Sequence, residues 1–269
     1  MLAYTYWILN NIYIIYVVFS EHKACYLDTL KRFAPFENIL IINNNSRLNF
    51  KDLNCHKGTN KNREFSGYLE GFEKIKNKIK DDDIVIFCND TFMSRRYFMG
   101  YFHTIFIFLA YFYRIFSNKA PFICGEVHKL NEKITKKNKI IIPNHISTYF
   151  FITNKTTVVK FISNFNSKLS INLNIKKSTF ISPALDSKYI DRLNKWIFSE
   201  KNGWYNGQKP DNANKEFLIK KATSVFLEHN LALLSRERRI KLIPIYSARR
   251  YSISRFFLFL FNLYAKIFH

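Results

Sequence analysis

The chain has few cysteines. Four occur in 269 residues, far apart in the sequence and without a CxxC pair. This spacing argues against a zinc site or a disulfide framework and favours a reducing, cytosolic setting. The N-terminal apolar stretch also lacks a preceding basic segment and a following small-residue cleavage site, so we predict no secretory signal.

Acidic residues are scarce as well. The chain has 42 Lys and Arg against 20 Asp and Glu, a net charge of +22, which favours phosphorylated small molecules, an anionic membrane face or nucleic acid as partners. No helix-turn-helix, zinc-finger or RNP pattern is present, which argues against nucleic acid. Phe occurs 28 times and aromatic residues make up 17% of the chain, and this composition favours a membrane surface.

The hydrophobic pattern predicts an α/β fold. Residues 12–19, 39–42 and 84–88 are short apolar runs typical of buried strands. Residues 21–33, between the first two runs, have helical spacing, so we expect a parallel β-α-β unit with a right-handed crossover. With 48% apolar residues the chain can bury a large core. We therefore expect one domain over residues 1–247, with a mostly parallel sheet and flanking helices.

Polar side chains follow two of these predicted strands. Asn43, Asn45 and Ser46 come directly after the second strand, and Asn89 and Asp90 end the third. Ligands of open α/β sheets bind at the carboxyl ends of the strands. We therefore expect these residues at a ligand site, with Asp90 the strongest single candidate. The alternatives are a solvated Asn-rich turn after the second strand and a simple capping role for Asp90.

A polar loop precedes the third strand and leads into a helix. The loop carries Asn62, Arg63 and Glu64, and the helix has an apolar stripe at spacings of four, three and four residues: Tyr68, Phe72, Ile75 and Ile79. A helix N-terminus and an arginine both attract phosphate. The alternative for Arg63 and Glu64 is an ion pair on the surface.

This order of elements, with ILIINNNS, GTNKNREFSGYLEGF and VIFCNDTF, resembles the GT-A nucleotide-sugar glycosyltransferases. The resemblance is greatest to the family 2 rhamnosyltransferase-like branch and to relatives in rhamnan-synthesis, O-antigen and capsule clusters. It implies a GT-A, Rossmann-like fold, a nucleotide-sugar donor, and a lipid-linked or cell-surface glycan acceptor in polysaccharide, lipopolysaccharide or capsule biosynthesis.

The resemblance also implies roles for individual residues. It places Asn43, Asn45 and Ser46 near the base and ribose of the donor. Asn62, Arg63, Glu64 and Asn89 would lie beside the donor, with Arg63 assisting the leaving group. Asp90 would hold a divalent cation, Mn²⁺ or Mg²⁺, on the diphosphate. The aspartate motif of the family is Cys88-Asn89-Asp90 here, with one carboxylate.

A second matching stretch lies at 216–244. The string EHNLALLSRERRIKLIPI resembles the Glu-Asp helix of the family and the strand that follows it, where the acidic pair supplies the general base. Glu228 matches the first acid, and His229 replaces the second. The resemblance therefore implies that Glu228 is the base, or His229 with a pKa near 6.5. The alternative for Glu228 is a surface carboxylate paired with an arginine.

Two aromatic, basic segments predict contact with a membrane. Residues 97–116 form a 20-residue apolar and aromatic run between arginines. We favour a helix lying in the membrane interface, or a helical hairpin that holds a lipid-linked acceptor, over a buried core helix. Residues 248–269 combine basic residues with a Phe/Leu face, as in a helix lying on anionic lipid. We therefore expect a peripheral protein on the cytoplasmic face of the cell membrane.

Three functions remain open from the sequence. The first is an inverting glycosyltransferase. The second is a catalytically degenerate member of the same fold that scaffolds a membrane glycan assembly, favoured by the single carboxylate and by His229. The third is a nucleic-acid-binding protein, which only the charge supports.

Overall fold

The structure is a computed structural model that describes residues 11–20, 27–31, 33–48, 50, 54–92, 120–129, 134–136, 139–141, 144–166, 170–200 and 209–244. The segments 97–116 and 248–269, which we expected at a membrane, lie outside these residues. Within the described part of the chain, no helix has both the length and the apolar character needed to cross a bilayer.

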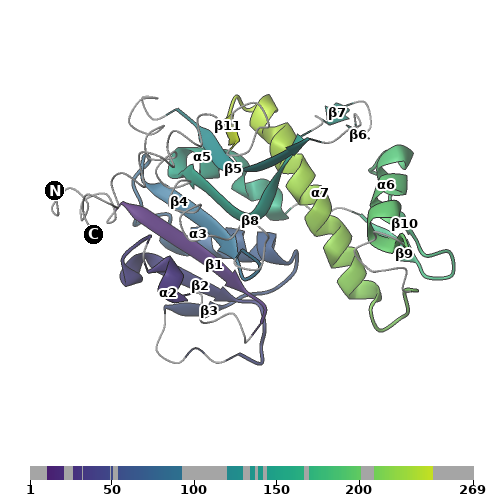
Figure 1. Cartoon of the computed structure of the whole chain (residues 1–269), viewed down its shortest axis with the longest axis horizontal. Helices are drawn as coiled ribbons and strands as arrows, with labels where there is room; N and C mark the ends of the chain where they lie inside the picture. Colours follow the sequence, from purple (N-terminus) through teal and green to yellow (C-terminus); the bar gives the residue numbers. More distant parts are fainter. Residues whose placement is uncertain are drawn as a thin grey trace, which may run out of the picture.

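A seven-stranded sheet forms the centre of the described structure (Figure 1), in the order β11-β5-β8-β4-β1-β2-β3. The pairs β1–β2, β1–β4, β2–β3 and β5–β11 are parallel, and β8 is antiparallel to both β4 and β5. The strands are β1 (Ile12–Val18), β2 (Ile39–Asn43), β3 (Cys55–Lys57), β4 (Ile84–Asn89), β5 (Phe122–Lys129), β8 (Asn144–Asn154) and β11 (Lys241–Pro244). The expected α/β fold with a mostly parallel sheet is confirmed.

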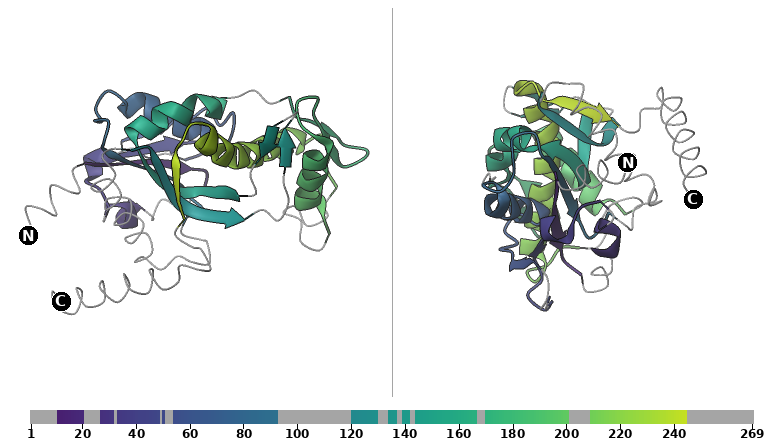
Figure 2. Two further views of the ribbon diagram at one scale, coloured as in Figure 1. Left: turned by 90° about the horizontal axis from the view of Figure 1, so that it is seen from above. Right: turned by 90° about the vertical axis from the view of Figure 1, so that its left-hand side faces the viewer.

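Helices cover both faces of this sheet (Figure 2). One face carries α3 (Glu64–Ile75), α5 (Lys155–Phe161), the 3-10 helix η3 (Ile162–Asn166) and α7 (Lys215–Glu237). The other face is covered by α2 (Leu27–Leu30), which is followed by the 3-10 helix η2 (Phe36–Asn38). The remaining elements are α6 (Ser187–Phe198) and two small hairpins, β6 (Ile134–Lys136) with β7 (Lys139–Ile141) and β9 (Asn172–Asn174) with β10 (Thr179–Ile181).

The central strands are apolar on both faces, as their continuous hydrophobic runs predicted. In β1, Ile15 and Val17 belong to the core under α3, whereas Ile14 and Tyr16 belong to the core under α2. All four side chains are fully buried. Strands covered on both sides lose the polar alternation of a half-exposed sheet, which explains why the sequence shows unbroken apolar runs here.

Two glycines allow α3 to lie close to β1. A Cβ atom at Gly67 would come within 2.8 Å of the Val17 side chain, and one at Gly71 within 2.5 Å of Ile15. Any larger side chain would push the helix away from the sheet. The close approach brings the N-terminus of α3, with Arg63 and Glu64, to the carboxyl edge of the strands.

Two strand segments differ in how clearly the sequence shows them. The apolar run at 139–142 predicts a strand, and Lys139–Ile141 forms one, in the small hairpin with β6. The segment around 147–151 carried no clear pattern, yet it belongs to β8 in the middle of the sheet. Its pattern is hidden because Thr148 and Thr153 are buried polar residues whose hydrogen bonds are made inside the core.

Helix α7 lies between the sheet and the α6 unit (Figure 1). The apolar side chains of α7, for example Leu218 and Phe226, are buried. Polar residues of α7 such as Ser224 and Asn230 are buried as well, because the helix packs against both β8 and β9. A helix at such a position can present polar side chains to two neighbours, and Glu228 and His229 lie on this helix.

Candidate active site

The Asn-rich loop after β2 is tied to β1 by its side chains. The Asn45 amide donates to the Phe19 carbonyl oxygen (2.8 Å), and the Asn45 backbone N–H donates to Asn43 Oδ1 (2.9 Å). The Asn43 amide in turn donates to the Leu48 carbonyl (2.9 Å). Ser46 is exposed at the turn. The three predicted nucleoside residues therefore lie at the carboxyl edge, and the two asparagines also hold the loop in shape.

Asp90 joins the ends of β4 and β1. Its carboxylate accepts a hydrogen bond from the Phe19 N–H (2.8 Å), and its own N–H donates to the Val17 carbonyl (3.1 Å). The residue is only 3% exposed. Neighbouring Asn89 accepts from the backbone and hydroxyl of Thr91 (3.0 and 2.6 Å). The predicted aspartate is thus at the expected strand end, with one oxygen engaged by the backbone.

Arg63 and Glu64 form a largely buried pair at the start of α3. The guanidinium lies 5.2 Å from the ring centroids of both Phe19 and Phe217, and Arg63 Nε is 3.6 Å from a Glu64 oxygen. The side chains are 21% and 10% exposed, so this pair is not the solvated surface pair that we had considered. Ser224 of α7 donates to the other Glu64 oxygen (2.8 Å). Two aromatic rings therefore fix the position of the cation.

Asn62 fixes the loop that precedes α3. Its side-chain amide donates to the Phe165 carbonyl in η3 (2.9 Å), and its N–H donates to Ser66 Oγ (3.2 Å). Arg63 itself has a positive φ of 53°, a backbone conformation that is uncommon for a side chain of this size. The surrounding contacts hold this residue in place. We call Asn43, Asn45, Arg63, Glu64 and Asp90 the strand-end site.

The peptide of Thr148 in β8 connects this edge to α7. The buried Tyr68 hydroxyl donates to the Thr148 carbonyl (2.7 Å), and the Thr148 N–H donates to Glu228 Oε1 (3.1 Å). Burial raises the pKa of Tyr68, and the negative charges of Glu64, Asp90 and Glu228 raise it further. Three acids that are far apart in the sequence therefore act on one buried phenol.

Glu228 also lines a cavity of about 350 Å³ between α6, α7 and the β5–β8 strands. We call it the histidine pocket, and its lining combines three imidazoles with one cation, one carboxylate and aromatic or aliphatic groups: His128, His145, Tyr189, Arg192, Leu193, Trp196, Val225, Glu228 and His229. Glu228 is half-buried and accepts a hydrogen bond from the backbone of β8, so it is more than the surface carboxylate paired with an arginine that we had considered.

The imidazoles of the histidine pocket lie in a row. The rings of His128 and His145 are stacked with centroids 4.9 Å apart, and His145 meets His229 edge to face, also at 4.9 Å. Burial and the neighbouring positive charges, including Arg192, lower the pKa of His145 to about 4 and that of His229 to about 3. Both rings are therefore neutral near pH 7.

This result corrects one expectation. We considered His229 as a base with a pKa near 6.5, but the buried ring has a pKa of about 3 and binds the Tyr189 hydroxyl through Nδ1 (3.0 Å). A group with so low a pKa is a weak proton acceptor near neutral pH. Of the two residues, Glu228 is the one that suits the role of base.

The spacing of His128 and His145 in the sequence is not that of metal ligands, and it does not connect the two residues. They are direct partners in the antiparallel β5–β8 register. If the pairing of β5 with β8 could be predicted from the sequence, the two histidines would be predicted to lie side by side. The segment between the two strands is long, and its length hides their register. The sequence did not indicate that Arg192 and Trp196 line a pocket. An amphipathic pattern predicts the helix but not which element lies against its polar side.

His128 also has serine and glutamate neighbours, but the geometry does not form a catalytic triad. Ser147 Oγ lies 2.8 Å from His128 Nε2, and Glu126 Oε1 lies 3.3 Å from the same nitrogen. A triad needs the acid and the nucleophile on opposite ring nitrogens. The second Glu126 oxygen accepts from the Tyr149 hydroxyl (2.7 Å), so this acid mainly orders the two strands.

The described residues do not form a metal-binding site made only of protein side chains. No group of three or more His, Cys, Asp or Glu side chains among them has the arrangement of a metal site. Mg²⁺ on a nucleotide needs only one or two protein carboxylates, because the phosphates and water supply the other ligands. Asp90 fits that smaller role.

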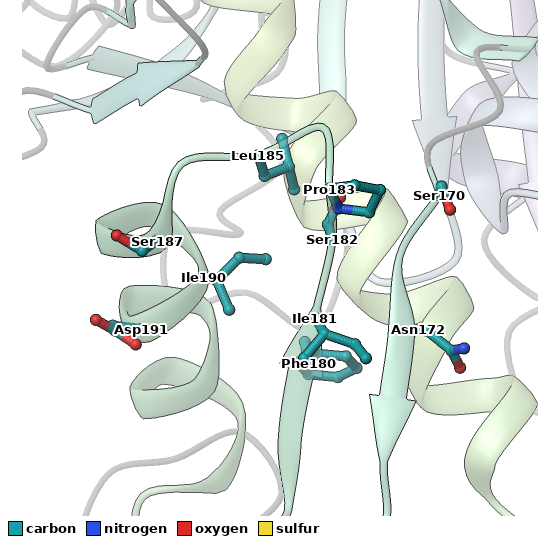
Figure 3. Close-up of a pocket in the computed structure, with 10 residues that line it drawn as sticks. All are labelled: Ser170, Asn172, Phe180, Ile181, Ser182, Pro183, Leu185, Ser187, Ile190 and Asp191. Carbon is teal, nitrogen blue, oxygen red and sulfur yellow. The ribbon is translucent and has the colours of Figure 1, made fainter.

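A second cavity, of about 510 Å³, lies between α6 and the β9–β10 hairpin. Figure 3 shows Ile190 extending from α6 toward β10, whereas Asn172 on β9 points away from the helix. The polar groups of this cavity are hydroxyls, an amide and the exposed Asp191, and they do not converge on one point. We therefore place the candidate chemistry in the strand-end site and the histidine pocket.

Comparison with known proteins adds no assignment. No protein-family model matches the chain, and a search of curated proteins finds no significant match.

Proposed function

We propose that the protein is a GT-A-type glycosyltransferase that moves a sugar from a nucleotide-sugar donor to a lipid-linked or cell-surface glycan acceptor, with inversion at the anomeric carbon. The observation that carries this proposal is that Glu64, Asp90 and Glu228 are each held inside the fold by a hydrogen bond from another element. These acids come from the start of α3, the end of β4 and the middle of α7. The mostly parallel sheet supports the proposal because it is compatible with the Rossmann-like fold that the resemblance implies.

The strand-end site suits the donor. A departing nucleoside diphosphate develops negative charge, which a fixed cation stabilises without further rearrangement. Arg63 is such a cation, since Phe19 and Phe217 hold its guanidinium in place. Asn43 and Asn45 shape the loop where the base and ribose would lie. A divalent cation bound with the donor would add positive charge at the diphosphate, and Asp90 is the residue that would contact it.

The histidine pocket suits the acceptor. In the proposed reaction an acceptor hydroxyl attacks the anomeric carbon while the bond from that carbon to the diphosphate breaks. Glu228 takes the proton of the hydroxyl as a general base. The Thr148 N–H, bound to Glu228 Oε1, fixes the orientation of this carboxylate. The attacking hydroxyl and the leaving diphosphate then lie on opposite sides of the sugar, which gives inversion.

The proposed setting is the cytoplasmic face of the cell membrane, in polysaccharide, O-antigen or capsule biosynthesis. The net charge of +22 and the 28 phenylalanines support a peripheral association with anionic lipid. A lipid-linked acceptor would be presented at that surface.

The scaffold alternative has one observation in its favour. Several side chains of the strand-end site already bind backbone groups, as Asp90 binds the Phe19 N–H and Asn45 binds the Phe19 carbonyl. Purely structural roles would produce the same contacts. Turnover distinguishes the two functions, because a scaffold would release no nucleotide from a donor.

The test is a transfer assay with UDP-, GDP-, dTDP- and CMP-sugars, with membranes as the source of acceptor and release of the nucleotide as the readout. We expect release from one donor class and a loss of about 10²- to 10⁴-fold in Glu228→Gln, the usual contribution of a general base. Glu216→Gln is the matched control, since Glu216 is exposed at the start of the same helix and pairs with Lys220. No release from any donor, or an unchanged rate in Glu228→Gln, would contradict the proposal.

A further inference from the structure

We infer that the histidine pocket binds a sugar that carries an anionic group, a carboxylate or a phosphate, with the anion at Arg192 and a ring hydroxyl at Glu228. The role of this sugar as the acceptor rests on the proposed function. The binding of this sugar does not rest on the proposed function, because it can be measured without a donor and without turnover.

The pocket combines one cation with one carboxylate. Among its lining residues, Arg192 is the cation and Glu228 the carboxylate. Burial is the main cause of the low pKa of His145 and of His229, and Arg192 is close enough to lower both further. Arg192 and Glu228 also shift the pKa of Tyr189 in opposite directions, although burial is the main cause of that shift. A ligand with an anion at one end and a hydroxyl at the other offers a partner to each of these two side chains.

The row of histidines favours hydroxyl groups between these two ends. With His145 and His229 neutral near pH 7, each ring has one nitrogen that donates and one that accepts. Sugar hydroxyls do both. Charged imidazoles would instead have added positive charge to the pocket, and both ring nitrogens would then only donate, which favours anions over hydroxyl groups.

Trp196 supplies an apolar surface at the rim. It is 42% exposed and lines the cavity with Leu193, while the Lys221 ammonium lies 5.5 Å from the centroid of its ring system. An indole at the mouth of a polar pocket can pack against the C–H face of a sugar ring. The pocket volume of about 350 Å³ is in the range of small-molecule sites.

The experiment is calorimetric titration of the full chain with glucuronate and galacturonate, with glucose 1-phosphate and glucose 6-phosphate, and with neutral glucose and galactose. We expect at least one anionic sugar to bind about tenfold more tightly than its neutral parent, the size expected for a charged hydrogen bond. Preference for the uronates or for the phosphates identifies the anionic group. Arg192→Gln should remove the preference and leave the weak binding of neutral sugar.

Lys195→Gln is the matched control, because Lys195 is an exposed cation on the same helix and does not line the pocket. Unchanged thermal unfolding of Arg192→Gln shows that the variant folds. Equal binding of charged and neutral sugars, no effect of Arg192→Gln, or no binding of any sugar overturns the inference. Selective binding without any nucleotide release keeps the pocket and rejects the glycosyltransferase. Release of nucleotide without selective binding rejects the anionic-sugar pocket and keeps the glycosyltransferase.

Discussion

The strand-end site and the histidine pocket use polar residues in different ways. In the strand-end site, Asn43, Asn45 and Asp90 bind backbone groups of neighbouring strands and loops. In the pocket, polar side chains mostly meet one another, as the three histidines and Tyr189 do. Mutations at the strand ends should therefore affect stability together with binding, whereas pocket mutations at the rim should affect binding alone.

The largest expected effect on stability comes from pH and involves the pocket. The pKa of His229 is about 3 in the folded protein and near 6.5 in an unfolded chain. Between these values the unfolded state binds the extra proton, so the stabilisation present above pH 6.5 is lost as the pH falls toward 3. By pH 4.5 this residue alone should cost about 3 kcal/mol.

Urea unfolding at pH 7 and pH 4.5 measures this loss. His145 and Arg192 also face the ring, and His145 adds a loss of the same sign. His229→Gln should therefore show a clearly smaller decrease between the two pH values than the parent protein. His56→Gln on β3 is the control, since that histidine lies far less deeply buried. An equal decrease in His229→Gln and the parent would contradict the assigned pKa.

An intermediate effect is expected at the strand ends. Asn45→Ala removes the bond to the Phe19 carbonyl and the bond that Asn45 Oδ1 accepts from the Arg47 N–H. The loss in unfolding free energy should be about 1–2 kcal/mol. Chemical denaturation provides the measurement, with Lys57→Ala as a control at an exposed position of neighbouring β3. If both variants lose equally little, Asn45 does not stabilise the loop.

The smallest effect on stability is expected at the pocket rim. Trp196→Ala truncates a side chain that is 42% exposed, so the unfolding free energy should change by no more than about 0.5–1 kcal/mol. Binding of the sugar that the pocket selects should nevertheless weaken at least about tenfold, because the aromatic surface is lost. A large loss of stability with unchanged sugar binding would mean that Trp196 belongs to the core.

The sequence predicted the strand-end site better than the pocket, and the reason is physical. Local apolar runs fix β1, β2 and β4, and parallel strands bring their carboxyl ends to one edge, so Asn43 and Asp90 could be placed together in advance. The pocket depends on β8, whose buried threonines hide its pattern, and on the β5–β8 register. It also depends on the contact between α6 and α7, which periodicity alone does not reveal.

The buried environment of Glu64 and His229 also could not be predicted from the sequence. Glu64 binds Ser224, which lies 160 residues away, and only the packing of α3 against α7 creates that pair. The low pKa of His229 arises from burial and from His145 and Arg192, neighbours that come from β8 and α6. Properties set by such distant contacts appear only once the fold is known.

The central claim is that the strand-end site binds a nucleoside diphosphate, and thermal unfolding with UDP, GDP, dTDP and CMP tests it most directly. Each nucleotide is added with and without Mg²⁺ or Mn²⁺, to the parent protein, to Asp90→Asn and to Asp28→Asn. Asp90→Asn keeps an acceptor for the Phe19 N–H but loses the charge, and Asp28 is an exposed control.

We predict that one nucleotide stabilises the parent and Asp28→Asn by roughly 2.7 kcal/mol at about 100 times its dissociation constant, and that Asp90→Asn loses this gain. If no nucleotide stabilises the parent protein, or if Asp90→Asn responds as the parent does, the strand-end site is not the donor site.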